Sequence, residues 1–314
     1  MDDSEISQPS ASGPQLAVFS YFHFNPAIHE HEKPYEILIN LPIAQAHNRD
    51  YRRHNEEFES CTTVVDDVRG RESDFTLDRN GFCWRDWEGP IDWKGLRAQD
   101  IKELGHDWIQ SGYIKYVENF IKAELEKMDG QPIDIVKVFD YRLRVSSHLK
   151  DFEGRTLDLN DGLDPIIPVI HPHVDQSFEG AATRVRVHMG DRARELLKRR
   201  FRIINVWRPL APVVNWPLAA CDSRTVSIED LVPADLVRKQ YVGETFYSTY
   251  NANHRWYYRS DQKPTEVTML KIHDSDPSAD TRFCLHSSFQ LAGHGVKDTR
   301  ESFEVRALVF DALA

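Results

Sequence analysis

The sequence predicts a mainly β protein with flanking helices, in which two facing sheets form a jelly roll. Three observations lead to this prediction. After residue 133, short segments rich in β-branched and aromatic residues recur about eight times. Pro and Gly turns separate these segments, and one helical pattern interrupts them. Many short strands with few helices are typical of a jelly roll.

The chain of 314 residues predicts a single domain over residues 15–314, with an N-terminal arm and helices. Residues 1–14 are rich in Ser, Pro and acidic residues, so we expect a disordered leader. The net charge of -11 argues against nucleic-acid and anionic-membrane partners and favours a small-molecule substrate. No secretory signal or apolar membrane span is present, which predicts a cytoplasmic protein. The four scattered cysteines suggest neither a zinc site nor disulfides, and nothing fixes the oligomeric state.

The first part of the chain combines two short strands, an arm and a helix. Strands are expected at 16–22 and 36–41, and residues 46–96 read as an arm packed on the main body. From residue 97 to 127 apolar residues recur every three or four positions, which predicts an amphipathic helix. The Ser111-Gly112 pair marks a place where that helix can break.

The remaining chain alternates strands with one more helix. Strands are expected at 133–145, 165–175, 201–210, 244–250, 255–258, 266–272, 282–289 and 301–310. A helix is expected at 181–200, where the basic residues 198–200 complement the negative end of the helix dipole. Ser227, followed by two acidic residues, opens a further short helix.

A candidate metal-binding pair ends the strand predicted at 165–175. His173 and Asp175 are two residues apart, so on a strand their side chains face the same way. If a second histidine joins them, two imidazoles and one carboxylate occupy one face of an iron(II) ion. The opposite positions then stay open for a co-substrate and dioxygen.

His286 is the candidate third ligand. It lies among apolar residues in the strand predicted at 282–289, and a buried imidazole needs a hydrogen-bond partner or a metal. Taken alone, a hydrogen-bonded core histidine is the commoner explanation. The residues downstream shift this balance towards a metal ligand.

Arg300 and Ser302 stand two residues apart on the last predicted strand, where together they can hold a carboxylate. An iron site that uses 2-oxoglutarate needs such a pair, because the keto acid chelates the metal while its far carboxylate binds an arginine. Arg306 is on the same strand face and is the alternative partner. Glu304, between them, is placed to form an ion pair with one of the two arginines.

Several longer motifs resemble the fungal AsaB-like hydroxylase/desaturase family, which includes gibberellin-desaturase-like and cephem-methoxylase-like oxygenases. The matching segments are residues 173–177, 202–210, 253–258, 266–274 and 300–310, and the similarity covers most of the chain after residue 15. The resemblance implies a double-stranded β-helix, the cupin-like jelly roll, with non-haem iron(II), 2-oxoglutarate as co-substrate and O2. It also implies that His173, Asp175 and His286 bind iron and that Arg300 and Ser302 bind 2-oxoglutarate.

Other polar and aromatic residues are weaker candidates. Asn205 and Arg208 follow the basic helix, and we expect them at the co-substrate or in a salt bridge that closes the barrel. Arg142 and Arg144 share a strand face and are candidate substrate contacts, with surface ion pairs as the alternative. Trp256 and Tyr258 are candidate pocket aromatics. His171 shares a strand face with His173 and is the substitute ligand if the register differs.

The sequence thus predicts a non-haem iron(II)/2-oxoglutarate-dependent dioxygenase. It would oxidise an unactivated C–H bond of a small secondary metabolite by hydroxylation, desaturation or ring formation. Two alternatives remain: a metal-dependent cupin-type oxidase or isomerase without 2-oxoglutarate, and a non-catalytic jelly-roll binding module with structural histidines. Pocket shape, which the sequence does not give, decides the substrate and the outcome.

Overall fold

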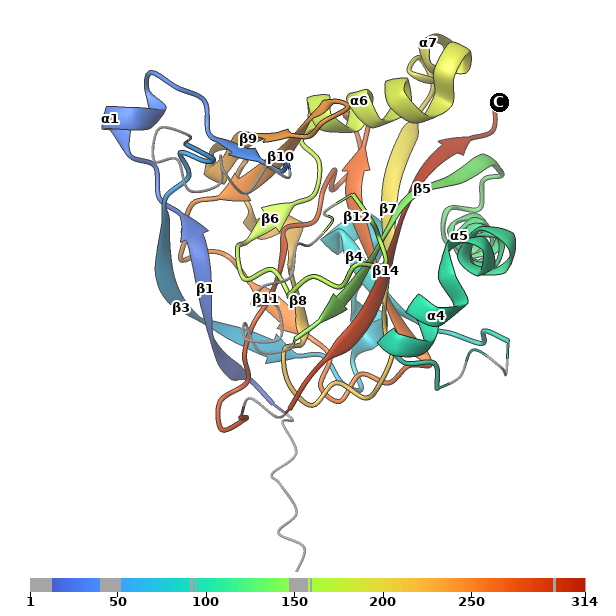
Figure 1. Cartoon of the computed structure of the whole chain (residues 1–314), viewed down its shortest axis with the longest axis horizontal. Helices are drawn as coiled ribbons and strands as arrows, with labels where there is room; N and C mark the ends of the chain where they lie inside the picture. The colour runs from blue at the N-terminus through green and yellow to red at the C-terminus, as the bar shows by residue number, and fades with distance from the viewer. Residues whose placement is uncertain are drawn as a thin grey trace, which may run out of the picture.

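Two sheets face each other and the helices lie outside them (Figure 1). The computed structural model describes residues 13–39, 52–90, 93, 95–146, 158, 160–295 and 298–313. The arrangement is the two-sheet, mainly β one that the sequence predicts. The leader predicted for residues 1–14 lies almost entirely outside the described residues, as does part of the strand predicted at 36–41.

The larger sheet has nine strands, and the candidate ligands come from its middle. In spatial order it consists of β1 (Gln15–Phe22), β3 (Phe58–Asp67), β11 (Trp256–Tyr258), β8 (Leu218–Cys221), β13 (His286–Ser288), β6 (His173–Val174), β10 (Val242–Ser248), β9 (Leu231–Val237) and β2 (Tyr35–Ile37). β6 and β13 are antiparallel neighbours, and their register pairs His173 with His286. This pairing brings together two residues that are distant in the sequence.

The smaller sheet has five long strands. In order they are β4 (Phe82–Asp86), β12 (Glu266–Asp274), β7 (Phe201–Pro209), β14 (Glu301–Asp311) and β5 (Ile133–Val145). Each strand is antiparallel to its neighbours. The register places Asn205 of β7 beside Arg306 of β14, and Ser302 of β14 beside Arg144 of β5. Polar residues of three strands therefore meet on one sheet.

Each face of the five-stranded sheet has its own hydrophobic core. Towards the larger sheet, Ile203, Leu270 and Leu308 pack with Phe19 and Trp256. Towards the helices, Val206 and Val305 pack with Val117 and Ile121 of the helix that covers them. Alternate residues of a strand face opposite sides, so the sequence of each central strand supplies both cores.

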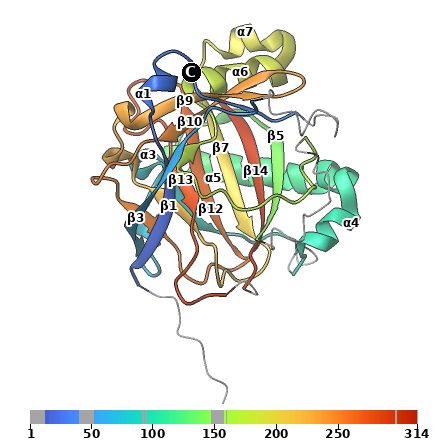
Figure 2. The ribbon, with the colours of Figure 1, turned by 60° about the vertical axis from the view of Figure 1, so that its left-hand side comes forward.

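The helices cover one flank and one end of the sheets. They are α1 (Pro26–His29), α3 (Leu77–Asn80), α4 (Ala98–Trp108), α5 (Ile114–Asp129), α6 (Phe178–Met189) and α7 (Ala193–Leu196). α4 and α5 lie beside the five-stranded sheet, on the side away from β1 and β3 (Figures 1 and 2). A π-helical turn, Ile109–Tyr113, joins α4 to α5 at the place where the sequence suggests a break. Ser227 caps a short 3-10 helix, Ile228–Asp230, as predicted.

The strand predicted at 165–175 is mostly wrong. The structure has only β6 there, together with one isolated bridge between Ile166 and Arg144. Three prolines in this segment, Pro165, Pro168 and Pro172, remove the backbone donors that a ladder requires. The candidate metal pair is therefore held at the end of an irregular segment rather than on a long strand.

The helix predicted at 181–200 begins earlier and ends earlier. Ser177 caps α6, and Gly190 ends it with a positive φ of 54°. The basic residues 198–200 follow the C-cap of the short α7, Leu197, rather than the end of α6. Arg199 pairs with Asp134 at 2.9 Å and Arg200 with Asp274 at 2.7 Å, so they tie the chain to the sheets.

Residues predicted as an arm also contribute strands. β3 lies in the larger sheet and β4 forms the edge of the smaller one. Within the described part of the chain, ten strands begin at or after residue 133, whereas the sequence suggests about eight. β8 and β9 are the strands that the pattern missed.

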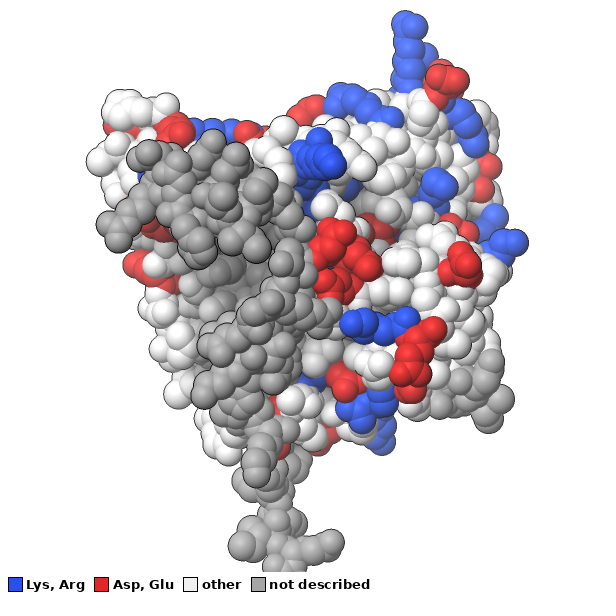
Figure 3. Space-filling model, in the orientation of Figure 1, with Lys and Arg blue, Asp and Glu red and all other residues white. Residues whose placement is uncertain are grey.

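On the face in Figure 3, acidic and basic side chains of the described residues are interspersed. No broad single-sign patch of described residues is visible on that face. None of the described helices combines the length and the apolar character needed to cross a bilayer.

Candidate metal centre and its two cavities

Three side chains with metal-ligand chemistry converge between the sheets. His173 lies on β6, Asp175 directly follows it, and His286 begins β13. One ligand atom from each lies within 4.8 Å of the other two. His173 Nε2 is 3.7 Å from Asp175 Oδ1, and the two imidazole centroids are 4.3 Å apart. Two imidazoles and one carboxylate in this arrangement match a facial set of ligands for iron(II).

Backbone carbonyls fix which ring nitrogen faces the centre. His173 Nδ1 donates to the carbonyl of His171 at 2.7 Å, and His286 Nδ1 donates to the carbonyl of Cys284 at 3.1 Å. A carbonyl only accepts, so the proton of each neutral ring sits on Nδ1. Both Nε2 lone pairs are then available to a metal, as in metal sites whose histidines are oriented from behind.

Asp175 is held from two directions by residues of the five-stranded sheet. Arg306 Nη2 donates to its Oδ1 at 2.9 Å, and Asn205 Nδ2 donates to its Oδ2 at 2.5 Å. Glu304 accepts from both of these partners, at 3.2 Å from Arg306 and 2.9 Å from Asn205. These bonds orient the carboxylate and link the two sheets across the centre.

The electrostatics keep His286 and Asp175 in ligand-competent forms. Burial and the neighbouring His173 lower the pKa of His286 to about 3, so its imidazole is neutral. Burial alone would raise the pKa of Asp175, but Arg306 and the two histidines hold it well below its ordinary value. The carboxylate is therefore ionised, as a metal ligand must be.

A small cavity of about 290 Å³, mouth included, lies beside the histidines. Its walls include His173, His286, Trp207, Ser288 and Arg300. Arg300 Nη1 donates to the carbonyl of Trp216 at 2.9 Å and to Ser288 Oγ at 3.0 Å, and its guanidinium lies 5.3 Å from the Trp207 ring centroid. The arginine is thus fixed in place without an acidic partner among the described residues.

Three buried polar atoms of Arg300, which lines this cavity, and of Ser302, two residues further along β14, lack hydrogen-bond partners within the described part of the chain. They are Arg300 Nε, Arg300 Nη2 and Ser302 Oγ. Burial and the nearby Arg144 lower the pKa of Arg300 to about 9, which reports an uncompensated positive charge. Unpaired buried donors of this kind are costly unless a ligand satisfies them. A carboxylate fits, because it accepts from the guanidinium and the hydroxyl together.

A larger cavity of about 830 Å³, mouth included, also borders the triad. His173 and Arg144 line both cavities, whereas Asp175, Arg142 and Arg306 line only the larger one and His286 lines only the smaller one. The triad therefore borders two cavities of different size. A co-substrate and a substrate can each approach the same centre.

The structure brings most of the predicted residues to this site, but two of them contact a different group from the one expected. Asn205 and Arg306 were expected at the co-substrate, and the structure places them on Asp175 instead. Arg142 and Arg144 lie at the larger cavity as candidate substrate contacts, and Arg144 Nη1 also donates to the Ile167 carbonyl at 3.0 Å.

Arg208 does not face either cavity. It lies three residues after Asn205 on β7, so it points to the opposite face of the sheet, towards the helices. There its Nε donates to the Tyr113 hydroxyl at 3.2 Å, and its guanidinium lies 5.5 Å from the Trp87 ring centroid. The expectation of a co-substrate contact or a barrel-closing salt bridge is corrected to packing under α4 and α5.

Trp256 and Tyr258 lie in the core between the sheets and line neither cavity. Trp256 Nε1 donates to the Tyr21 hydroxyl at 2.9 Å, and Tyr258 donates to the Gly13 carbonyl at 2.9 Å. β11 is several strands away from β6, which the sequence did not reveal. His171 also stays outside the centre, with its Nδ1 3.1 Å from the Ser20 carbonyl.

Sequence reasoning missed three residues at the larger cavity: Gln176, Arg184 and Arg238. For Arg184 a signal exists, because it lies four positions after Gly180 on the buried face of α6. A basic residue on such a face needs an explanation. Nothing in the sequence marks Arg238, whose position depends on the pairing of β9 with β10.

The chain is similar to a set of fungal biosynthetic enzymes. The model of the oxidoreductase/YMDC permease-like domain family matches residues 20–310. The gibberellin cluster GA4 desaturase of Gibberella fujikuroi is 33% identical over 307 residues, covering 80% of this chain and 88% of that protein. The Fe(II)/2-oxoglutarate-dependent dioxygenase nvfI of Aspergillus novofumigatus is 30% identical, with 78% and 81% covered. The hydroxylase/desaturase asaB of Aspergillus flavus is 36% identical over 192 residues, 54% of this chain and 83% of that one.

A solved structure confirms the fold. The iron and alpha-ketoglutarate-dependent endoperoxidase NvfI superposes with a TM-score of 0.74 at 23% identity, over 96% of this chain and 99% of that one. The predicted jelly roll is therefore confirmed, together with the predicted family resemblance. The chain belongs to the fungal AsaB-like hydroxylase/desaturase family of iron(II)- and 2-oxoglutarate-dependent oxygenases.

Proposed function

We propose that His173, Asp175 and His286 bind the iron(II) and that Arg300 with Ser302 binds the far carboxylate of 2-oxoglutarate. One observation carries this assignment: the two histidines of a two-histidine, one-carboxylate cluster share a small cavity with the buried Arg300, whose Nε and Nη2 lack partners among the described residues. Ser302, two residues further along β14, has a buried hydroxyl that also lacks a partner there. The reaction would be oxidation of an unactivated C–H bond of a small metabolite, by hydroxylation, desaturation or ring formation.

When bound, iron(II) with 2-oxoglutarate and dioxygen supplies the oxidising chemistry, and succinate and carbon dioxide are released. The protein's share is orientation and the exclusion of water. The carbonyls of His171 and Cys284 aim both imidazoles, while Arg306 and Asn205 keep Asp175 ionised and correctly turned. Trp207 packs against Arg300 and shields its pairing with a carboxylate from solvent.

The larger cavity would receive the substrate, with Arg142 and Arg144 as its polar contacts. A cytosolic location remains part of this proposal. It is supported by the four cysteines, Cys61, Cys83, Cys221 and Cys284, which are all free thiols, as expected in a reducing compartment.

The test is anaerobic addition of iron(II) and then 2-oxoglutarate to the purified protein. We expect a visible charge-transfer band from the chelated keto acid, and succinate once air is admitted. His173→Ala should abolish both signals, whereas Arg300→Gln should weaken 2-oxoglutarate binding and leave iron binding intact. The exposed Arg186 lies outside both cavities, so Arg186→Gln is the matched control.

The two alternatives give different results in the same experiment. An oxidase or isomerase that uses no keto acid would bind iron but produce no band with 2-oxoglutarate. A binding module with structural histidines would retain no stoichiometric iron. A wild-type protein that loads iron normally and shows neither band nor succinate contradicts the proposed role of Arg300.

A further inference from the structure

The larger cavity is lined by more basic groups than acidic ones. Its guanidinium groups belong to Arg142, Arg144, Arg184, Arg238 and Arg306. Among the described residues, the acidic side chains on its walls are Glu36 and Asp175. This excess of positive charge occurs inside a chain whose net charge is -11. Buried charges are normally paired, so the cavity has unused capacity for an anion.

Two of the five arginines, Arg306 and Arg142, form ion pairs with nearby carboxylates. Arg306 contacts Asp175 at 2.9 Å, Glu304 at 3.2 Å and Asp140 at 3.1 Å. These three carboxylates neutralise the positive charge of Arg306. Arg142 has the same Asp140 at 3.6 Å, and its Nη1 donates to the carbonyl of Asp161 at 3.3 Å. One carboxylate thus serves two guanidinium groups, and Arg142 is only partly neutralised.

Arg144 and Arg184 have no acidic partner within ion-pair distance in the described part of the chain. The side chains are buried, with residue exposures of 9% and 8%. Arg144 donates to a backbone carbonyl, that of Ile167. Arg184 donates to the hydroxyl of Tyr241, and its guanidinium lies 4.8 Å from that ring's centroid. Neutral acceptors orient both groups without cancelling their charge.

The electrostatic consequences are visible in neighbouring groups. Burial would raise the pKa of Asp140, but Arg142, Arg306, Arg184 and Arg238 together lower it. Burial lowers the pKa of Arg144; attraction by Glu304 and Asp175 opposes this shift, and repulsion from Arg306 and Arg142 adds to it. The guanidinium groups therefore lie close enough to repel one another, and an additional anion between them would relieve that repulsion.

We propose that the substrate carries a carboxylate, and that Arg142 and Arg184 bind it in the larger cavity beside the triad. The inference rests on the proposed function, because it assumes that this cavity receives the substrate. Guanidinium forks match a carboxylate with two parallel hydrogen bonds. Binding the acid at this wall leaves the apolar part of the substrate to extend towards Val169, Leu236 and the metal ligands.

The 2-oxoglutarate carboxylate does not account for these groups. Its proposed partners, Arg300 and Ser302, have unpaired buried atoms of their own, and Arg300 lines the smaller cavity but not the larger one. Arg144 lines both cavities and would be partly neutralised by the co-substrate, whereas Arg142 and Arg184 line only the larger one. The test therefore uses Arg142 and Arg184.

The experiment compares 2-naphthylacetic acid with its methyl ester on the anaerobic iron(II)–2-oxoglutarate complex. The two probes have the same aromatic body and differ in charge. Isothermal titration calorimetry gives each affinity, with 2-oxoglutarate saturating so that the smaller cavity is filled. We expect the acid to bind wild type at least about tenfold more tightly than the ester, the effect of one charge-assisted hydrogen bond.

Arg142→Gln and Arg184→Gln should each reduce the affinity of the acid about tenfold and leave that of the ester unchanged. Arg186→Gln is the matched control, because Arg186 lies two residues from Arg184 on α6 and its side chain is half exposed. It should change neither affinity. Arg184→Lys keeps the charge and should recover part of the preference, and the unfolding midpoint of every variant reports its folding.

Equal affinity of wild type for acid and ester, including no binding of either, overturns the inference. So does a loss of acid binding that is the same in Arg186→Gln as in Arg184→Gln. The charge-transfer band reports separately on the co-substrate. A band without any preference for the acid contradicts only the carboxylate site, whereas a missing band in wild type contradicts the proposed function.

Discussion

At the scale of single residues, the centre depends on groups that never touch the metal. Asn205 shows this most clearly, because its Nδ2 donates to Asp175 at 2.5 Å and to Glu304 at 2.9 Å. Arg306 supplies the charge that keeps Asp175 ionised, whereas Asn205 supplies orientation. Sequence reasoning assigned both residues to the co-substrate, because a strand face says which side a residue points to but not which partner it meets.

Replacing Asn205 with Ala should weaken iron(II) binding by about 10- to 100-fold, the usual cost of losing an outer hydrogen bond to a ligand. The reason is that Asp175 loses one of its two anchors, while the ligand atoms themselves remain. Anaerobic iron titration measures the effect. Asn160→Ala, at an exposed turn, is the control. Unchanged iron affinity in a folded Asn205→Ala protein would contradict the positioning role.

Glu56 predicts a pH dependence of stability away from the centre. Burial, with Glu36 nearby, raises its pKa to about 8 from an ordinary value of 4.5. Between these two pH values the folded state binds more protons than the unfolded state, so stability falls as the pH rises from 4.5 to 8. Glu56→Gln keeps the neutral shape and should flatten this part of the curve.

The measurement is chemical denaturation of wild type and Glu56→Gln at pH 6 and pH 9. The variant should be more stable than wild type at both pH values and by a larger margin at pH 9, because at pH 6 wild type has lost only part of this stability. Glu59→Gln serves as the control, because Glu59 is half exposed. If the difference between the two proteins were the same at both pH values, Glu56 would not be the titrating group.

At the scale of elements, α6 is held against β10 at a very short distance. A Cβ on Gly180 would lie 2.2 Å from the carbonyl oxygen of Glu244, which belongs to the backbone and cannot move alone. The same carbonyl also accepts a hydrogen bond from the backbone N–H of Ser177 at 2.9 Å. Ser177 lies only two residues after Asp175 in the sequence. The start of α6 and the metal ligand are thus positioned by one contact with β10.

Gly180→Ala should destabilise the protein by about 1–3 kcal/mol, the usual cost of forcing extra volume into a packed contact. Because the helix must shift, 2-oxoglutarate turnover should fall as well. Thermal unfolding and succinate release measure the two effects. Gly112→Ala is the control, since its added Cβ would meet only Trp93 at 3.8 Å. A Gly180→Ala protein as stable as the control would show that the approach is not tight.

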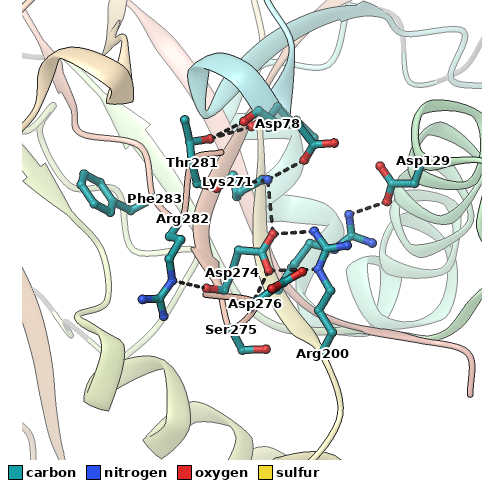
Figure 4. Close-up of polar contacts among 12 residues, drawn as sticks. Asp78, Asp129, Arg200, Lys271, Asp274, Ser275, Asp276, Thr281, Arg282 and Phe283 are labelled. Carbon is teal, nitrogen blue, oxygen red and sulfur yellow. Dashed lines mark hydrogen bonds and ion pairs between the residues drawn. The ribbon is translucent and has the colours of Figure 1, made fainter. Parts of the chain in front are cut away.

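The five-stranded sheet also contains a buried charge network (Figure 4). Lys271 of β12 is fully buried, and its Nζ reaches Asp78 at 2.6 Å, Asp274 at 3.3 Å and the carbonyl of Thr281 at 3.3 Å. Arg200 contacts both oxygens of the same carboxylate, with Nε 3.1 Å from Asp274 Oδ1 and Nη2 2.7 Å from Asp274 Oδ2. The network joins α3, β12 and the start of β7, so it fixes the end of the sheet that is covered by α6 and α7.

Lys271→Met should cost about 3–5 kcal/mol, because Asp274 stays buried after one of its two cations is removed. Denaturant unfolding measures the loss. Lys122→Met is the comparison, since Lys122 forms an exposed pair with Glu126 at 3.8 Å and should change stability by less than about 1 kcal/mol. Equal losses in the two variants would mean that the buried network contributes no more than a surface pair.

At the scale of the whole molecule, the proposed metal ligands join strands from across the fold. His173 and His286 pair within one sheet, while Asp175 is anchored to the other through Arg306. A metal bound there would connect the two sheets, and it would bind the unfolded chain weakly because His286 is then far from His173 and Asp175. Metal binding should therefore stabilise the whole fold.

Manganese(II), used anaerobically as a stand-in for iron, should raise the free energy of unfolding by about 2.7 kcal/mol at 100 times its Kd. A chelator should reverse the effect. His286→Ala should unfold at the same midpoint with and without manganese. A similar midpoint shift in that variant would place the stabilising metal elsewhere.

The sequence by itself determined much of this protein. Local periodicity and turn residues predicted the two-sheet β fold and most strands, and the order of His173, Asp175, His286 and Arg300 predicted the kind of site. These signals are local, because strand alternation depends on neighbouring residues and residue chemistry depends on the residue itself. The three prolines at 165–172 were visible too, and they broke a strand that apolar character alone had suggested.

Only the tertiary structure decided which partners meet. Strand order placed Trp256 and Tyr258 in the core, strand alternation turned Arg208 towards the helices, and the pairing of β14 with β7 moved Asn205 and Arg306 onto Asp175. The guanidinium groups of the larger cavity come from β5, α6, β14 and the end of β9, so no local pattern reveals them. The reason is physical: register and layer packing are set by contacts between distant segments, and those contacts exist only in the folded chain.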